Sequence, residues 1–287
     1  MDLNNKLNQI RIRDIIIIYL LSIFIVTGIV FTIIKLNHRE IGDLILSALT
    51  LILHLLILII LLLRIKPSKD DILFLYYDFK KKVNRREVIE VTFVKICLAI
   101  GGSKLIISTI YFIDPSVINN FIRESTTLIN SLRNYLINVV LLLVAPIMEE
   151  IIFRNIIFNR IIEKFNMWTG IVVSSIVFAS FYAGSGITGA IALGVINCIL
   201  YIKYNNILIP MFVSIINNII LLIWSIPIIN NNIGNMIIGH NYIINIFFGS
   251  IVSLMGIFLL IKFINKNINI LKAYDKNIKD KKEYSNI

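Results

Sequence analysis

Residues 144–154 read Val-Ala-Pro-Ile-Met-Glu-Glu-Ile-Ile-Phe-Arg, which places two adjacent carboxylates, Glu149 and Glu150, and one cation, Arg154, in an apolar stretch. A charged side chain in the middle of a membrane span costs about 2.5 to 3.5 kcal/mol even on a lenient insertion scale. Such groups are kept where they pair with each other, line a wet cavity or take part in chemistry. This segment is therefore the first candidate for a functional site.

The chain around this segment has the composition of a membrane protein. Of its 287 residues, 57% are hydrophobic, whereas soluble domains are about 45 to 50% apolar. The apolar residues form blocks long enough to cross a bilayer as a helix, which takes about 20 residues. We therefore predict an all-α fold: a polytopic membrane helical bundle of about eight transmembrane helices, in a single integral membrane domain over residues 1–287. The helices are expected near residues 15–34, 44–63, 91–113, 135–158, 168–184, 187–203, 207–229 and 242–262.

The formal net charge of +11 comes largely from basic residues in the segments between these spans. In a soluble protein this excess would favour nucleic-acid binding, but here it indicates membrane orientation, and we expect no nucleic-acid partner. Eight spans put both termini on one side. If that side is the cytoplasm, 21 of the 28 lysines and arginines lie inside and four outside (Lys35, Arg39, Arg123 and Arg133). The positive-inside rule thus predicts a multi-pass protein of the cell membrane with both termini cytoplasmic.

Two basic segments fall on the cytoplasmic side of this topology. Residues 64–87 contain eight lysines and arginines together with Phe74, Tyr76 and Tyr77. We expect an ordinary cytoplasmic basic loop there, and an interfacial helix on anionic lipid is the alternative. Residues 266–287 are expected to form a solvated basic cytoplasmic tail.

The three charges of residues 149–154 are not equivalent. On an α-helix Glu150 and Arg154 stand one turn apart on one face, so an ion pair between them is expected. Glu149 points about 100° away and is free to face a cavity, where its carboxylate can act as a general base on water. Pro146 is expected to bend the helix and free a carbonyl. An ion pair that serves packing alone is the alternative, but it leaves Glu149 unexplained.

The pattern Glu149-Glu150-x-x-x-Arg154 resembles the E-E-x-x-x-R signature of the CPBP intramembrane proteins. That family includes the type II CAAX prenyl endopeptidases and bacteriocin-processing or self-immunity homologues. Its second and third motifs, F-x-x-x-H and H-x-x-x-N, align with Phe178-Ala-Ser-Phe-Tyr182 and Ser214-Ile-Ile-Asn-Asn218. The resemblance covers about residues 130–230, which it marks as a CPBP-like core.

Both motif histidines are replaced, by Tyr182 and by Ser214. The resemblance implies that Glu149 activates water, that Glu150 and Arg154 set its position, and that Asn218 with Tyr182 stabilises the oxyanion. A zinc site built on glutamate and histidine has also been proposed for the family. Tyrosine and serine hydroxyls are poor zinc ligands, so we predict no metal and no cofactor. The hydroxyls can still donate hydrogen bonds, although one missing oxyanion donor costs about 10² to 10³ in rate.

Other polar residues inside the predicted spans have simpler expected roles. Lys104 needs a partner, for which a carboxylate such as Glu149 is considered. Asn197 and Asn217 are expected to form hydrogen bonds between helices. His54, alone in the second helix, is expected to be packed or hydrogen-bonded rather than catalytic.

Two functions follow from these observations. The first is a glutamate-dependent intramembrane endopeptidase, or its degenerate descendant, whose substrate is a prenylated or membrane-embedded peptide. The second is a non-catalytic membrane protein that binds a peptide, lipid or membrane-protein partner in an immunity or regulatory role. Membrane lipids are partners in both cases. A small-solute transporter is a third class, but no inverted repeat supports it. We expect the five candidate residues to converge on one cavity in the cytoplasmic half of the membrane: Glu149, Glu150, Arg154, Tyr182 and Asn218.

Overall fold

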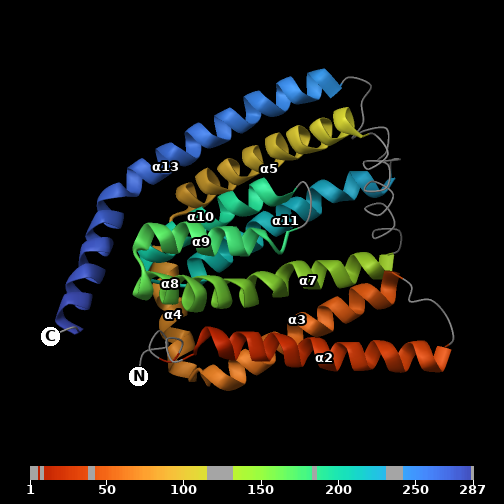
Figure 1. Ribbon diagram of the computed structural model, residues 1–287, viewed down its shortest axis with the longest axis horizontal. Coiled ribbons are helices and arrows are strands. Elements are labelled where there is room, and N and C mark those ends of the chain that lie inside the picture. The colour runs from red at the N-terminus through yellow and green to blue at the C-terminus, as the bar shows by residue number, and fades with distance from the viewer. Residues whose placement is uncertain are drawn as a thin grey trace.

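The computed structural model describes residues 6, 10–37, 43–114, 132–182, 186–230 and 242–285. Within these ranges the chain is helical apart from short connections, and no strand is present, so the predicted all-α bundle is confirmed. Figure 1 shows the arrangement. The elements are α2 (Ile12–Asn37), α3 (Asp43–Ile65), α4 (Lys69–Lys82), α5 (Arg85–Ile113), α7 (Leu132–Glu150), η1 (Ile151–Phe158), α8 (Asn159–Lys164), α9 (Met167–Ala179), α10 (Ile187–Tyr204), α11 (Leu208–Asn230) and α13 (Tyr242–Ser285).

Each of the eight predicted spans corresponds to a helix, although the bounds differ. In the described part of the chain, five helices are long and apolar enough to cross a membrane, at Ile12–Lys35, Ile45–Ile65, Arg85–Ile113, Ile187–Tyr204 and Tyr242–Asp280. The segments Met167–Ala179 and Leu208–Ile220 are apolar but shorter. The protein is therefore a multi-span membrane protein.

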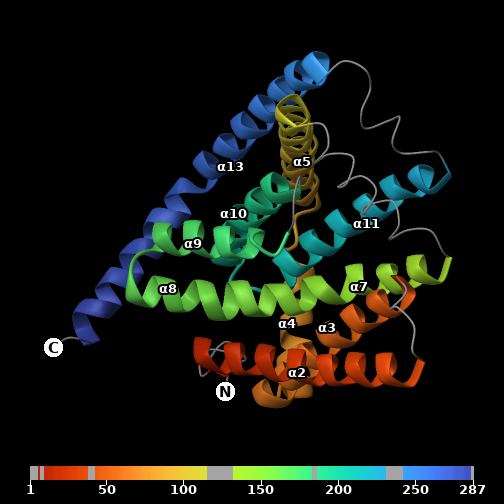
Figure 2. The same cartoon turned by 45° about the vertical axis from the view of Figure 1, so that its right-hand side comes forward.

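The helices alternate in direction between two ends of the bundle (Figures 1 and 2). The start of α2 and the end of α13 lie at the same end of the bundle in Figure 1. Contacts place other basic segments at this end too: Lys6 reaches Asp71 of α4 at 2.6 Å, and Lys203 of α10 reaches Glu87 at the start of α5 at 2.6 Å. Lys6 and Lys203 therefore lie at the same end of the bundle as the start of α2 and the end of α13.

Small residues allow α5, α10 and α13 to pack almost backbone to backbone. A Cβ placed on Gly101 of α5 would lie 2.6 Å from the backbone nitrogen of Ser253 in α13, and one on Gly189 of α10 would lie 2.7 Å from the Cβ of Ala99 in α5. Thr188 also donates a hydrogen bond to the Leu98 carbonyl at 2.9 Å. Close approach at small residues, with a hydroxyl bond across the interface, is a common way to join helices in a membrane.

We expected the segment 64–87 to be a loop. It contains the helix α4 instead. Ser68 caps its first turn: the Ser68 hydroxyl accepts from the Asp71 backbone N–H, and the Asp71 carboxylate accepts from the Ser68 N–H. This reciprocal capping box satisfies two N–H groups that a helix start leaves without acceptors. The expectation of a loop was wrong because it weighed the charge of the segment above its capping signal.

The segment 266–285 also differs from the solvated tail that we expected. α13 continues through it without a break to Ser285, with Asn267 and Leu271 buried. Lys282 donates to the carbonyls of Ile162 and Phe165 at 2.9 and 2.6 Å, where α8 ends. A cation at the C-terminal carbonyls of a helix is favourable, so the lysines of this segment are partly structural.

Candidate functional site

The motif glutamates lie where the helix changes its winding. α7 contains Pro146 and ends at Glu150, and the chain continues as the π-helix η1, whose residues are almost all buried. π-helical turns are rare and often occur at functional sites. The wider turn and the proline both reduce ordinary α-helical hydrogen bonding here, which makes side-chain partners from other helices necessary.

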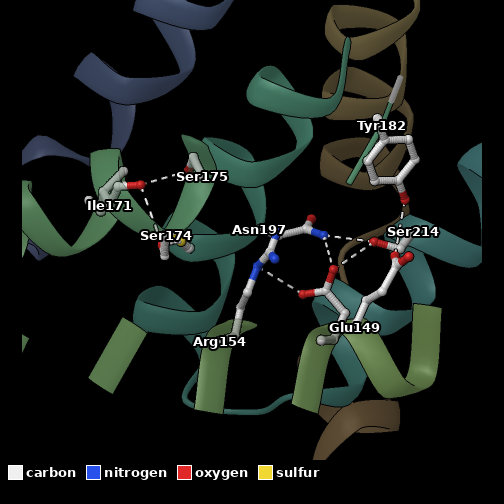
Figure 3. Close-up of polar contacts among 10 residues, drawn as sticks. Glu149, Arg154, Ile171, Ser174, Ser175, Tyr182, Asn197 and Ser214 are labelled. Carbon is white, nitrogen blue, oxygen red and sulfur yellow. Dashed lines mark hydrogen bonds and ion pairs between the residues drawn. The ribbon is translucent and has the colours of Figure 1, made fainter. Parts of the chain in front are cut away.

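Glu150 and Arg154 form the expected ion pair, with Arg154 Nε 3.0 Å from Glu150 Oε2. Both side chains are fully buried. The other oxygen, Glu150 Oε1, accepts from the amide of Asn197 at 2.7 Å and from the hydroxyl of Ser214 at 2.9 Å. Asn197 also donates to Ser214 at 2.7 Å. The pair is thus held by Asn197 of α10 and Ser214 of α11, which Figure 3 labels.

The guanidinium group of Arg154 makes few other polar contacts. It stacks over the ring of Phe178, with its central carbon 4.5 Å from the ring centroid. None of its N–H groups has an aligned hydrogen-bond acceptor among the described residues, although Nε lies at ion-pair distance from Glu150. The arginine is therefore fixed by charge and by cation–π contact more than by hydrogen bonds.

Glu149 is separate from this ion pair and has a different partner. The hydroxyl of Tyr182 donates to Glu149 Oε2 at 3.0 Å. In Figure 3 Tyr182, Glu149 and Ser214 lie together on one side, and Arg154 lies on the other side of the cluster. The structure therefore brings Glu149, Glu150, Arg154 and Tyr182 into one polar cluster.

A chain of aromatic ring contacts leads away from Tyr182. Phe178 lies 5.1 Å from Tyr182 and 5.2 Å from Phe153, centroid to centroid. Phe153 contacts Phe181 at 5.7 Å, and Phe181 contacts Tyr19 of α2 at 6.1 Å. The side of the cluster that Tyr182 occupies is thus packed with aromatic rings.

Asn218 takes a role that the sequence did not predict. Its amide donates to the backbone carbonyl of Leu142 at 2.8 Å. In an α-helix this carbonyl would accept from residue 146, but that residue is Pro146, which has no N–H. Asn218 therefore supplies the donor that the proline lacks. The expected freed carbonyl exists, and the asparagine that we assigned to the oxyanion is bound to it.

Two more polar residues were predicted to join helices. Asn197 does so, because it bonds to Glu150 of α7 and Ser214 of α11. Asn217 does not: its amide donates to the Val213 carbonyl within its own helix at 2.8 Å. Sequence reasoning also missed Tyr201, whose hydroxyl donates to Asn155 at 2.6 Å and so holds the π-helix.

Lys104 and His54 lie outside this cluster. Lys104 donates to Asn245 of α13 at 3.0 Å and lies 5.7 Å from the Phe248 ring centroid, so its partner is not Glu149. The ring nitrogen Nδ1 of His54 lies 2.8 Å from the Thr50 carbonyl, as expected for a hydrogen-bonded histidine. His38 and His240 lie outside the described residues.

The side chains of the cluster do not fit a zinc site. Zinc in proteins is held by imidazole, thiolate and carboxylate, and the positions of the motif histidines present the hydroxyls of Tyr182 and Ser214. Both hydroxyls are bonded to the two glutamates. The chemistry available here is that of carboxylates with hydrogen-bond donors.

Comparison with known proteins shows what the segment that holds this site is similar to. Residues 131–220 match the family model described as Type II CAAX prenyl endopeptidase Rce1-like. This range contains α7, η1, α8, α9, α10 and the first half of α11, and it holds all five candidate residues. The resemblance of this segment to the CPBP family, which the E-E-x-x-x-R pattern predicts, is therefore confirmed.

One curated relative is similar over a segment of the same length. A protein of Bacillus subtilis (strain 168) named "Putative membrane peptidase YdiL" is 32% identical to this chain over 90 residues. The alignment covers 31% of this chain and 37% of the relative's length. No solved structure was found to match the chain.

Proposed function

We propose that this chain is a glutamate-dependent intramembrane endopeptidase, with Glu149 as the general base. The observation that carries the proposal is that, among the described residues, Glu149 accepts a hydrogen bond from Tyr182 and forms no ion pair, whereas Glu150 is bound to Arg154, Asn197 and Ser214. A carboxylate outside an ion pair can take a proton from water. The substrate class we propose is a prenylated or membrane-embedded peptide.

In this mechanism each of the other residues has a positioning or charge-stabilising role. The Glu150–Arg154 pair, bound to α10 and α11, fixes the end of α7 and so fixes Glu149. Water deprotonated by Glu149 attacks the peptide carbonyl, and the oxyanion that forms needs hydrogen-bond donors within about 3 Å. Tyr182 becomes such a donor if its hydroxyl turns from Glu149 to the oxyanion. Asn218 can contribute only if its amide leaves Leu142.

A non-catalytic role is the second candidate, and one observation favours it. All three donors at the motif positions already have acceptors: Tyr182 binds Glu149, Ser214 binds Glu150, and Asn218 binds Leu142. A site whose donors are committed stabilises an oxyanion poorly. In this case the site binds a peptide, lipid or membrane-protein partner, as an immunity or regulatory protein would.

The two candidates are separated by measuring chemistry and cellular function in the same variants. Purified protein in lipid nanodiscs is incubated with a fluorogenic prenylated peptide and with a membrane-embedded peptide. Under the endopeptidase proposal the wild type cleaves one of them slowly, and Glu149→Gln abolishes cleavage because an amide cannot take a proton from water. Absence of wild-type cleavage, with full cellular function in Glu149→Gln and loss in Arg154→Ala, supports the non-catalytic role and overturns the endopeptidase.

We also propose that the protein lies in the cell membrane with both termini in the cytoplasm. The gathering of Lys6, Lys203 and the lysines of α4 at the end where α2 begins and α13 ends supports this orientation. Positive charge flanking membrane spans is retained on the cytoplasmic side.

A further inference from the structure

The helix α4 has no part in the proposed chemistry, and its place in the chain is unusual. It lies between the candidate spans Ile45–Ile65 and Arg85–Ile113. Only three residues separate it from α3 and two separate it from α5. Three extended residues reach at most about 10 Å. α4 must therefore lie at the level where those two spans leave the bilayer.

One face of α4 is fastened to the bundle. Leu75 is buried, and its carbonyl accepts from the amide of Asn206 at 3.0 Å. Phe79 packs edge-on against Phe212 of α11 with a centroid distance of 5.4 Å. In both views α4 runs across the direction of α2 and α7 (Figures 1 and 2). Because the spans run through the bilayer, a helix that crosses them lies roughly along its surface.

The opposite face of α4 is apolar and open. Phe74 is 64% exposed and Tyr77 is 67% exposed. Ile72, Leu73 and Tyr76 are at least half exposed as well. Five large apolar side chains on a helix of 14 residues are far more than a water-facing helix normally presents. Tyrosine and phenylalanine of this kind are typical of the boundary between headgroups and acyl chains.

The charge around this face is positive, because two of the three acidic residues of α4 are paired with lysines. Asp71 pairs with Lys6 at 2.6 Å, and Asp78 pairs with Lys82 at 2.9 Å. Burial alone would raise the pKa of Asp78, but hydrogen bonds from Asn206 and Lys82 outweigh it and lower the pKa, so the pair stays ionised. Asp70 is in the first turn of the helix, away from the basic end. Within the described chain no acidic group forms an ion pair with the exposed cations that remain: Lys69, Lys80, Lys81, Arg85 and Arg86.

We propose that α4 is an interfacial helix that lies on a bilayer leaflet containing anionic phospholipid. Phe74 and Tyr77 enter the boundary between headgroups and acyl chains, and Lys80 and Lys81 contact the lipid phosphates. Charge complementarity selects this occupant, since the exposed face combines aromatic residues with unpaired cations. A peripheral protein is the competing occupant, but it would have to displace the leaflet that the short connections bring to α4.

The test uses the full chain with a reporter on the open face. Tyr77→Cys is labelled with an environment-sensitive fluorophore, and the two native cysteines are buried and so are poorly labelled. The protein is reconstituted into phosphatidylcholine vesicles with increasing phosphatidylglycerol. Quenching by a lipid spin-labelled near the headgroup reports contact with the bilayer, and quenching by aqueous iodide reports exposure to water.

The expected result is lipid quenching with protection from iodide, both increasing with the fraction of phosphatidylglycerol and decreasing with added salt. One lysine near an anionic surface changes the affinity about fivefold. In the Lys80→Gln/Lys81→Gln variant, the fraction of phosphatidylglycerol that gives half of the maximal protection from iodide should therefore be several times higher. The matched control is Lys272→Gln/Lys276→Gln, which removes the same charge from exposed positions of α13 and should leave the dependence unchanged.

Three outcomes would overturn the proposal. The first is free iodide access at residue 77 in every vesicle. The second is lipid contact that does not change with the fraction of phosphatidylglycerol or with substitution of Lys80 and Lys81. That result would contradict the proposed preference for anionic phospholipid. The third is protection that appears only in native membranes and never in pure lipid, which would assign the face to a protein partner.

Discussion

Tyr182 donates a hydrogen bond to Glu149 at 3.0 Å from the position at which the family motif has a histidine. Ser214, at the other histidine position, donates to Glu150 at 2.9 Å. Each motif position that lacks the imidazole therefore carries a hydroxyl that is bonded to one of the two glutamates. What the two replacements change is the ability to hold and release a proton near neutral pH, which histidine has and a hydroxyl lacks.

Restoring the imidazoles should increase cleavage if the scaffold is otherwise competent. We expect Tyr182→His/Ser214→His to cleave a prenylated or membrane-embedded peptide at least about 10² faster than the wild type, the usual effect of one oxyanion donor. Initial rates in nanodiscs measure this. The same double substitution combined with Glu149→Gln is the control and should be inactive. A double variant that folds but is no faster than the wild type would show that the scaffold lacks more than the histidines.

The buried ion pair between Glu150 and Arg154 should contribute more to the free energy of unfolding than an exposed pair does. Arg154→Ala leaves the carboxylate of Glu150 buried and unpaired, which typically costs about 3 to 5 kcal/mol. Lys266→Ala breaks the more exposed pair with Glu90 and should cost less than about 1 kcal/mol. Equilibrium unfolding in mixed detergent micelles compares the two variants. Equal destabilisation would mean that the Glu150–Arg154 pair is not the buried anchor that its geometry indicates.

The bond from Asn218 to Leu142 can be tested by a double-mutant cycle with Pro146. Asn218→Ala leaves the part-buried Leu142 carbonyl without its donor, which costs up to about 1 to 3 kcal/mol. In a Pro146→Ala background residue 146 regains its N–H, so the same Asn218→Ala should cost much less. Unfolding free energies of the four proteins give the coupling. If the changes in unfolding free energy of the two substitutions simply add, Asn218 does not compensate for the proline. Its role would then be that of an oxyanion donor.

Reporter fusions test the orientation of the chain. Fusions after residues 75 and 275 should report the cytoplasm, and those after residues 40 and 120 should report the opposite side, because positive charge stays inside. An alkaline phosphatase reporter and a green fluorescent protein reporter at each position provide opposite signals. Alkaline phosphatase activity at residue 275 would contradict the proposed topology.

The sequence was most informative where one physical effect dominated. Blocks of apolar residues predicted the helices, and the spacing of Glu150 and Arg154 predicted their ion pair, because a charge in a bilayer must find a partner. Asn197 was predicted to join helices because a polar side chain in a bilayer also needs a hydrogen-bond partner. Each of these predictions needed only local spacing and the cost of burial.

The misses came from contacts between distant segments. Asn218 was assigned by its motif position, but the carbonyl that it binds lies 76 residues away and needs a donor only because of Pro146. Asn217 is the exception, because its acceptor lies four residues away in its own helix. For α4 and the end of α13, abundant lysines suggested solvent, although Asn206, Ile162 and Phe165 supply buried or capping contacts. Local composition does not contain these partners.

The close packing of α5 against α10 bears on how this protein can be recombined with its relatives. The family match begins at residue 131. Within the matched segment, Thr188 and Gly189 contact Leu98 and Ala99 of α5, which lie outside it. A transplant of residues 131–220 into another scaffold would leave the Thr188 hydroxyl without its acceptor and would put a bare glycine against acyl chains. The structural unit that contains the matched segment therefore includes α5, and it is larger than the 90 residues that the family model matches.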